Sequence, residues 1–356
     1  MNFDPSEEQQ LLADAVGGLL EGHAAGPRDP AAEWRDYRDF GLLDLPFSAE
    51  LGGPETMMPV MEAYGRTLAQ APYLQSILLA GRVLALAGAN DTLAAIRAGE
   101  RKAALCLYEP GLRYRWDAPA SVAVRSDAGW VLSGRKVAVL DAPGAGLFLV
   151  PATTPDGLSL FLVPADAPGV ALHARPTPDG RHAADLAFDA VLLPADAQLG
   201  TPSATRAILA EAIDGAVAAC CSEMVGAMAR VLAITTEYLA VRTQFGVVIG
   251  SFQALQHRAA DMLVAIEQAR SMTIYAVSML GAPAAERSVA VAAAKALVNR
   301  NARFVGSEAI QLHGGMGLAS EYPAGRYFQR LTVLETLLGD TDSLLDQVEQ
   351  GGGLPA

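Results

Sequence analysis

Two short motifs in the second half of the chain combine side chains that suit an anionic ligand. The first runs from Arg242 to Phe245 and places a guanidinium, the amide of Gln244 and an aromatic ring within four residues. The second begins at Gln311 and carries three glycines within the four residues 314–317. Arginine suits phosphate groups, and glycine lets a ligand or a second backbone approach the main chain closely. Together the motifs predict contacts to an extended, anionic and partly aromatic ligand.

Each motif also has a simpler interpretation when it is taken alone. Glycines that follow a helix usually end that helix, and an arginine at a helix end is usually solvated. We therefore give weight to the occurrence of both motifs in this order and separation, and not to either one.

The elements that position the motifs are predicted to be long helices. No proline occurs from residue 203 to residue 282, and apolar residues recur there at helical period. Ser251 is the expected N-cap of the helix that follows the first motif. Residues 1–100 also read as helices, and Ser6 to Gln9 forms a capping box at the start of the first.

The segment 101–200 differs from its flanks in amino-acid composition. Ten of the 21 prolines fall in it, and short runs such as 121–125, 130–133 and 158–163 favour strands. We interpret Ser133 to Lys136 as a hairpin turn. The order of segments predicts an α+β chain with a helical domain at 1–100, a β domain at 101–200 and a helical bundle, predicted as four helices, at 201–356.

Composition narrows the class of protein. The chain has 356 residues, 51% of them hydrophobic, and a formal net charge of −13, which argues against nucleic-acid binding. We expect no membrane span, because no apolar run reaches the length that a bilayer requires. The three cysteines and five histidines show no metal-ligand spacing, and few cysteines are typical of a cytoplasmic protein.

Read with their flanks, the two motifs resemble those of the acyl-CoA dehydrogenase family. That family carries Arg-x-Gln-Phe-Gly, then Phe-Gln, Gln-His and Ala-Asp-Met, and later Gln-x-His-Gly-Gly-x-Gly, all of which stand in this chain. The resemblance spans essentially the whole sequence and implies the fold of that family, FAD as cofactor and an acyl-CoA substrate. The residues that match cofactor contacts made across a subunit interface are Arg242, Gln244, Phe245, Gln311, Gly314 and Gly315.

The resemblance also implies a catalytic carboxylate, and this chain departs from the family there. The usual Tyr-Glu-Gly-Thr falls on residues 338–341, so Gly339 stands where the glutamate is expected. An alternative family position falls near Ala216. Asp340 and Asp214 are the nearest acids and remain weak candidates for a base. In the β domain, the chain keeps Glu109 of the flavin-facing motif but replaces the small residues that follow it.

Three hypotheses remain open. The chain is similar to the small subunits of heteromeric acyl-CoA dehydrogenases, such as those of pimeloyl-CoA dehydrogenases, which implies a larger partner subunit in a heterotetramer. In the second hypothesis, the chain is a self-sufficient dehydrogenase that forms a homo-oligomer and has its catalytic base at a displaced position. The third hypothesis is a scaffolding relative without a redox role.

Overall fold

The computed structural model describes residues 6–24, 29–49, 53–319 and 322–353. The chain divides into two compact units, each built from stretches that are separated in the sequence. Unit 1 combines Met1–Asp29, Gly52–Gln70 and Val217–Ala356, and unit 2 combines Pro30–Leu51 and Ala71–Ala216. The predicted α+β class with the acyl-CoA dehydrogenase arrangement, helices followed by strands and again helices, is confirmed. The domain boundaries at 100 and 200 stay a prediction.

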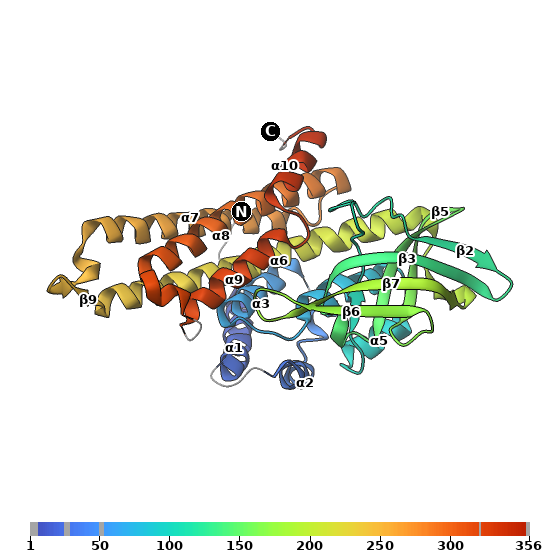
Figure 1. The fold of residues 1–356 in the computed structure, drawn as a ribbon, viewed down its shortest axis with the longest axis horizontal. Helices are drawn as coiled ribbons and strands as arrows, with labels where there is room; N and C mark the ends of the chain where they lie inside the picture. Colours follow the sequence, from blue (N-terminus) through green and yellow to red (C-terminus); the bar gives the residue numbers. More distant parts are fainter. Residues whose placement is uncertain (1–5, 25–28, 50–52, 320–321, 354–356) are drawn as a thin grey trace. The chain divides into compact units, whose positions relative to one another are not determined.

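Unit 1 is helical in its described residues, apart from one small hairpin (Figure 1). Its helices are α1 (Glu7–Ala24), α3 (Pro54–Thr67), the second half of α6 (Pro202–Val241), α7 (Gln253–Ser278), α8 (Ala284–His313), α9 (Pro323–Thr336) and α10 (Thr341–Gln350). The hairpin pairs β9 (Thr243–Gln244) with β10 (Val247–Val248). The 3-10 helix η5 (Ile249–Ser251) follows the first motif, and the 3-10 helix η6 (Gly314–Leu318) contains the glycines of the second.

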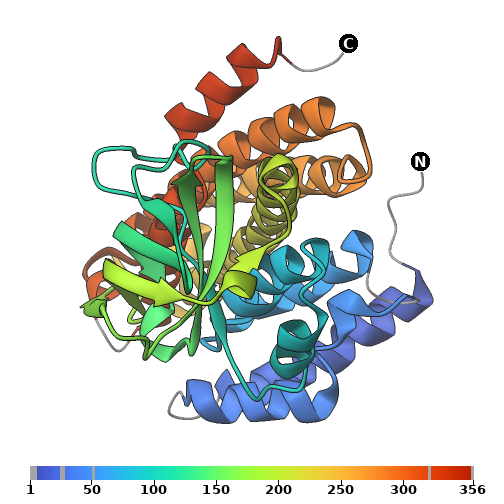
Figure 2. The same ribbon diagram turned by 90° about the vertical axis from the view of Figure 1, so that its right-hand side faces the viewer.

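Unit 2 contains an eight-stranded sheet, drawn in green tones in Figure 2, with short helices. The helices are α2 (Pro30–Phe40), α4 (Arg82–Leu86), α5 (Asn90–Arg97), the first half of α6, a π-helix η2 (Tyr73–Gly81) and 3-10 turns η1 (Leu45–Phe47), η3 (Ala142–Gly144) and η4 (Ala195–Ala197). The strands are β1 (Ala103–Leu105), β2 (Val122–Ser126), β3 (Gly129–Leu140), β4 (Leu147–Thr154), β5 (Gly157–Pro164), β6 (Val170–Pro176), β7 (His182–Leu193) and β8 (Gln198–Leu199).

The sheet has the order β6-β7-β3-β2-β4-β5-β8, with β1 parallel to β4. Alternate side chains of β3, β4 and β7 point into one apolar core, which includes Trp130, Phe148, Phe161 and Val191. The rings of Trp130 and Phe161 meet edge to face, with centroids 5.2 Å apart. This core is the rigid base on which the loops of unit 2 are held.

The predicted hairpin turn at Ser133–Lys136 is wrong. These residues lie inside β3, where a register shift between Leu132 and Gly134 marks a bulge. Gly134 has φ +158, and a Cβ there would lie 2.1 Å from Ser121 Oγ, so a close tertiary contact demands the glycine. The real turn precedes β3 and ends at Gly129, whose φ is +134.

Two glycines set the packing of α3 against α6 in unit 1. A Cβ on Gly65 would lie 1.9 Å from Glu223 O, and a Cβ on Gly226 would lie 1.9 Å from Glu62 O. The two helix backbones therefore touch at this crossing, and a methyl group at either position would separate them.

Charged pairs tie further helices of unit 1 to this crossing. Glu223 of α6 accepts a hydrogen bond from Arg330 of α9 at 2.7 Å, and both side chains are buried. Glu62 of α3 accepts from Arg270 of α7 with both carboxylate oxygens. The bundle positions of α7 and α9 are thus fixed by specific pairs as well as by apolar packing.

The predicted helix starts have different outcomes. The capping box of α1 is confirmed: Gln9 N donates to Ser6 Oγ at 3.2 Å, and Ser6 N donates to Gln9 Oε1 at 2.9 Å. The predicted N-cap at Ser251 is wrong, because α7 begins after Phe252 and the Ser251 hydroxyl donates to Val248 O inside η5.

The burial of helix α6 explains why the proline-free stretch is so apolar. By length and composition it could cross a membrane, but 78% of its most apolar window is buried within the structure. Burial of this kind is typical of the central helix of a bundle. Cys220 and Cys221 lie in it as buried free thiols.

Candidate functional site

The first motif forms an exposed hairpin at the junction of α6 and α7 (Figure 1). Gln244 pairs with Val247 across it, and Phe245 and Gly246 form the tip with φ values of +55 and +79. Two consecutive positive φ angles are typical of a type I′ turn, in which asparagine or glycine is the usual first residue. Phe245 instead places a ring that is 90% exposed on the tip. A strained, exposed aromatic residue points to a contact outside the chain.

Arg242 and Gln244 are the polar members of the motif. The Arg242 N–H donates to Tyr238 O at 2.9 Å and so ends α6, while its carbonyl accepts from Ile249 N at 2.8 Å. Its side chain is exposed, and among the described residues it contacts no carboxylate. The Gln244 amide donates to the adjacent Thr243 carbonyl at 2.7 Å. The backbone of the motif is thus fixed, and the guanidinium remains available to an anion.

The second motif forms the junction of α8 and α9. Gln311 is exposed on the last turn of α8, and Gly314 ends that helix with φ +58. A Cβ at Gly314 or Gly315 would meet nothing within 4 Å, so the turn is open on that side. Gly317 differs, because a Cβ there would lie 2.9 Å from Ile310 O. One glycine is required for packing and two leave room above the backbone.

The buried imidazole of His313 brings the two motifs together. It lies between Tyr238 of α6, at a centroid distance of 4.6 Å, and Tyr322, at 4.8 Å. His313 Nδ1 lies 2.8 Å from Ala309 O and so donates to that carbonyl. The other ring nitrogen, Nε2, is buried. Because Tyr238 is one turn before Arg242, this stacking places the arginine hairpin beside the glycine turn.

Burial lowers the pKa of His313, and hydrogen bonds to the backbone of Ala309 and Ile234 only partly oppose that shift. The shift favours the neutral form of the ring. Sequence reasoning missed this connection; the only signal was an aromatic residue one turn ahead of Arg242.

Apolar side chains are exposed around both motifs. They are Val241, Phe245, Val247, Val248, Phe252, Leu263, Val264, Met316 and Leu318, with exposed fractions from 38% to 90%. The rings of Phe245 and Phe252 lie 6.3 Å apart, which gives the hairpin a small aromatic cluster. Exposed apolar side chains gathered in this way are typical of a protein interface.

The position of the expected base is shaped for glycine. Gly339 has φ +130, a conformation that other residues rarely adopt, and it is buried between α9 and α10. A Cβ built on it would lie 2.9 Å from Leu344 Cδ2. A glutamate at this position would need a different backbone, so the side chain is excluded by conformation as well as by sequence.

The backbone around Gly339 is held by a buried polar network. Lys295 of α8 is fully buried; its ammonium donates to Asn299 Oδ1 and, at 2.8 Å, to Leu334 O. Asn299 Nδ2 donates to Gly339 O at 3.3 Å. These bonds connect α8 to the end of α9 and to the loop before α10, and they fix the glycine conformation.

The two carboxylates that are candidates for the base are Asp340 and Asp214. Asp340 is the N-cap of α10, where its Oδ1 accepts from Ser343 N at 2.9 Å. A base at this position would have to release the cap. Asp214 lies on the first half of α6 and is only 5% exposed. Ala216, at the alternative position, is fully buried.

Glu109, retained from the flavin-facing motif, has a structural partner. Its carboxylate accepts from Lys136 Nζ at 2.7 Å and from the backbone of Ala120 and Ser121 at 2.5 and 3.1 Å. Both charged side chains are almost fully buried. Burial alone would raise the pKa of Glu109, but these hydrogen bonds outweigh it and the pKa is lowered. Glu109 therefore pins the loop that spans residues 110–120.

That loop carries bulk where small residues are expected. Tyr108 and Tyr114 meet edge to face at 5.4 Å, and Arg113, with φ +47, stacks over the Tyr114 ring. Ala138 has φ +52 and donates its N–H to Asp185. It offers no side-chain donor to a ligand.

Comparison with known proteins identifies the family. Two family models match: the acyl-CoA dehydrogenase middle domain at residues 104–191 and the C-terminal domain at residues 207–352. The bovine mitochondrial short-chain specific acyl-CoA dehydrogenase is 28% identical over 88% of this chain and 81% of its own.

Two solved structures are similar over almost their full length. The Tcur3481-Tcur3483 steroid ACAD variant is 31% identical with a TM-score of 0.86, covering 97% of this chain and 99% of that one. The ChsE4-ChsE5 complex of Mycobacterium tuberculosis is 25% identical with a TM-score of 0.87, covering both chains fully. This chain belongs to the acyl-CoA dehydrogenase family.

Proposed function

We propose that this chain is the subunit of a heteromeric acyl-CoA dehydrogenase that lacks the catalytic glutamate and contributes FAD contacts across a subunit interface. The single observation that carries the proposal is the glycine-only backbone at residue 339, since it removes the base of the family from this chain. The partner would be a larger subunit with its own base, in a heterotetramer.

The residues present fit a dinucleotide held by a neighbouring subunit. The Arg242 guanidinium is unpaired among the described residues and suits a diphosphate. Gln311, Gly314 and Gly315 form an open turn beside it. When bound, FAD supplies the hydride acceptor for α,β-dehydrogenation of an acyl-CoA thioester. The residues of this chain would position its pyrophosphate and adenosine ends.

The surroundings of the motifs support an oligomer. Val241, Phe245 and Val247 lie next to Arg242 in the chain and are exposed, and a partner subunit that covers the Phe245 ring would explain its exposure. Each of the two similar solved structures is described as a pair of proteins, Tcur3481 with Tcur3483 and ChsE4 with ChsE5. A fatty acyl or steroid side chain is the substrate class that these relatives suggest. A cytoplasmic location is part of the same proposal, supported by three free cysteines.

The absorption spectrum of the purified chain tests the proposal. The chain is incubated with FAD, freed of excess, and examined alone and after co-expression with acyl-CoA dehydrogenase subunits that carry the glutamate. Flavin bands only in the complex, bleached anaerobically by an acyl-CoA, are the expected result. Flavin retained and bleached by the chain alone would instead make it a self-sufficient homo-oligomer with Asp340 or Asp214 as base. No flavin under either condition would leave a scaffolding role.

A further inference from the structure

Lysine is scarce in this chain, and its three lysines have unequal surroundings. Lys102, Lys136 and Lys295 are the only lysines among 26 basic side chains, and all three are in the described residues. Lys136 and Lys295 are fully buried and engaged, the first with Glu109 and the second with Asn299. Lys102 is partly exposed. It is therefore the one lysine side chain that a reagent in solution can reach.

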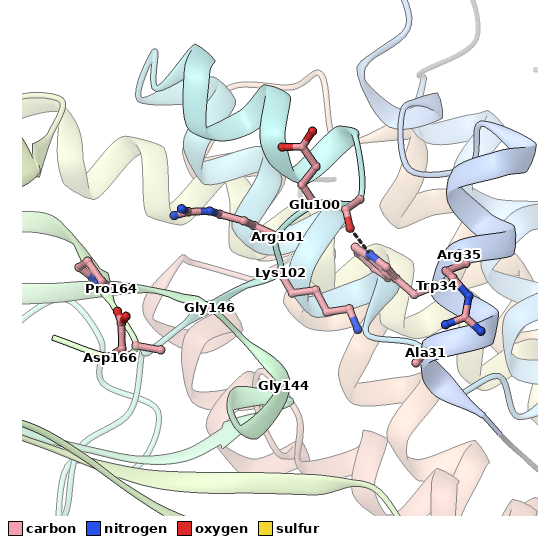
Figure 3. A pocket seen from close by; sticks show the side chains of 12 residues that line it. Ala31, Trp34, Arg35, Glu100, Arg101, Lys102, Gly144, Gly146, Pro164 and Asp166 are labelled. Carbon is pink, nitrogen blue, oxygen red and sulfur yellow. Dashed lines mark hydrogen bonds between the residues drawn. The ribbon is translucent and has the colours of Figure 1, made fainter.

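Lys102 lies in a pocket of unit 2 with a volume of about 830 Å³ (Figure 3). The pocket is bordered by α2, by the residues just before β1, by the turn around Gly144 and Gly146, and by residues 164–166 at and after the end of β5. Nothing in the proposed dehydrogenase function uses this pocket. Its residues are separate from both FAD motifs and from Gly339.

The Lys102 side chain is held over an aromatic floor. Its ammonium lies 5.0 Å from the centroid of the buried Trp34 ring, and the indole is fixed by a 3.1 Å hydrogen bond from Nε1 to Gly99 O. The Lys102 carbonyl accepts from Gly146 N at 2.9 Å. Burial lowers the pKa of Lys102, and Asp141 opposes that shift. A larger share of this amine is neutral, and hence nucleophilic, than of a solvated lysine.

Two guanidiniums line the same pocket as the amine. Figure 3 shows Arg35 on α2 beside Trp34, on the side to which the Lys102 ammonium points, and Arg101 extending in the opposite direction. Both arginines are exposed, and neither pairs with a carboxylate among the described residues. Three cations and two acids, Glu100 and Asp166, line the pocket of a chain whose net charge is −13. Arginine forks suit phosphates, so the pocket favours a phosphate-bearing reagent.

We propose that Lys102 is an acylation site, which takes its acyl group from the thioester of a phosphate-bearing carrier of the coenzyme A class. The neutral Nζ attacks the thioester carbonyl carbon, a C–N bond forms and the C–S bond breaks. The sulfur leaves with the bonding electron pair and takes the proton that the nitrogen loses. The products are an amide on Lys102 and a free thiol, and no oxidant or reductant is required. Arg35 and Arg101 hold the carrier's phosphates. This reaction goes beyond the proposed dehydrogenase function and uses neither FAD nor a partner.

Mass spectrometry of the full chain tests the proposal. The protein is incubated with acetyl-CoA or with S-acetyl-N-acetylcysteamine, a thioester without phosphates, and the modified residues are mapped by peptide. We expect one acetyl group on Lys102, formed at least about tenfold faster from acetyl-CoA at equal concentration. Lys102→Arg keeps the charge over Trp34 and should leave the N-terminal amine as the only modified group.

The arginine variants separate carrier binding from amine reactivity. Arg35→Ala and Arg101→Ala change exposed residues, so melting temperatures should be unchanged. Each should slow acetylation of Lys102 by acetyl-CoA and leave the rate with the small thioester unaltered. The proposal is overturned if Lys102 stays unmodified while the N-terminus reacts. It is equally overturned if both thioesters modify Lys102 at the same rate in all variants.

Discussion

The imidazole of His313 stacks on Tyr238 with ring centroids 4.6 Å apart, and this contact joins the arginine motif to the glycine motif. Neither residue contributes a charge. The pair instead determines where Arg242 and Gln311 lie relative to each other, because each stands within one turn of a motif residue. The proposed FAD contacts therefore depend on a neutral, buried ring.

Acid should weaken unit 1 through His313. Burial lowers its folded-state pKa below the usual 6.5. Between the two values the unfolded chain binds a proton that the folded chain does not, so the free energy of unfolding falls as the pH drops below about 6.5. His313→Phe, which keeps the stacking, should reduce this loss between pH 7.5 and 5.5 in urea unfolding. His257→Phe on the exposed face of α7 is the control. An undiminished loss in His313→Phe would contradict the assignment.

The glycine conformation at residue 339 should make side chains costly there. Gly339→Ala should destabilise the fold by about 1–3 kcal/mol, because φ +130 and the contact with Leu344 both oppose a Cβ. Gly339→Glu should be worse and should restore no dehydrogenase activity to the chain alone. Gly315→Ala is the matched control, since its Cβ would meet nothing within 4 Å. Equal stability of the two alanine variants would show that the loop can relax.

The buried pair of Glu109 and Lys136 should dominate the acid stability of unit 2. The folded pKa of Glu109 is below its usual 4.5, so its contribution is present above that pH and is lost as the pH falls through the folded value. Glu109→Gln should cost about 3–5 kcal/mol at pH 7, since it leaves Lys136 without a counter-charge. It should also flatten the acid limb of the stability curve. Asp117→Asn, which removes the exposed pair with Arg206, should cost about 0–1 kcal/mol. The prediction fails if both variants unfold alike.

Arg242 should matter for the cofactor and not for stability. Arg242→Ala should weaken FAD retention of the reconstituted complex by about tenfold or more, the ratio expected for one charge-assisted contact. Its melting temperature in the absence of FAD should match wild type, because the side chain is exposed. Arg230→Ala, on the same helix with one exposed partner at Glu237, should leave FAD retention unchanged. Equal loss in both variants would point to a general charge effect.

Local signals in the sequence predicted much of the fold. The capping box at Ser6 and the proline-free stretch around α6 depend on neighbours in the chain, and both predictions were confirmed. One prediction failed because a distant contact decides the conformation: Gly134 resembles a turn residue but serves the contact with Ser121. The other failed between two local alternatives, since Ser251 resembles a cap but its hydroxyl donates to Val248 O.

The same distinction, between what can be read from the sequence and what only the structure shows, applies to the candidate site. Arg242 and Gln311 are visible as motifs, whereas the stacking of His313 and Tyr238 is tertiary and has no sequence period. The glycine at residue 339, where the resemblance leads us to expect a glutamate, can be read from the sequence. That the backbone there excludes a side chain follows only from φ and from the position of Leu344. The roles of these residues toward FAD and a base stay predictions.

The glycine crossing of α3 and α6 has a consequence for synthesis on the ribosome. Gly65 of α3 is translated early. Gly226, on the part of α6 against which α3 packs, is translated only after the whole of the β-sheet unit. At usual elongation rates α3 waits about 8–30 s for the backbone it must touch. By the end of that interval the whole of unit 2, which ends at Ala216, has been translated. The first helices of the nascent chain therefore need protection, and the two units form in the opposite order to that of their first residues.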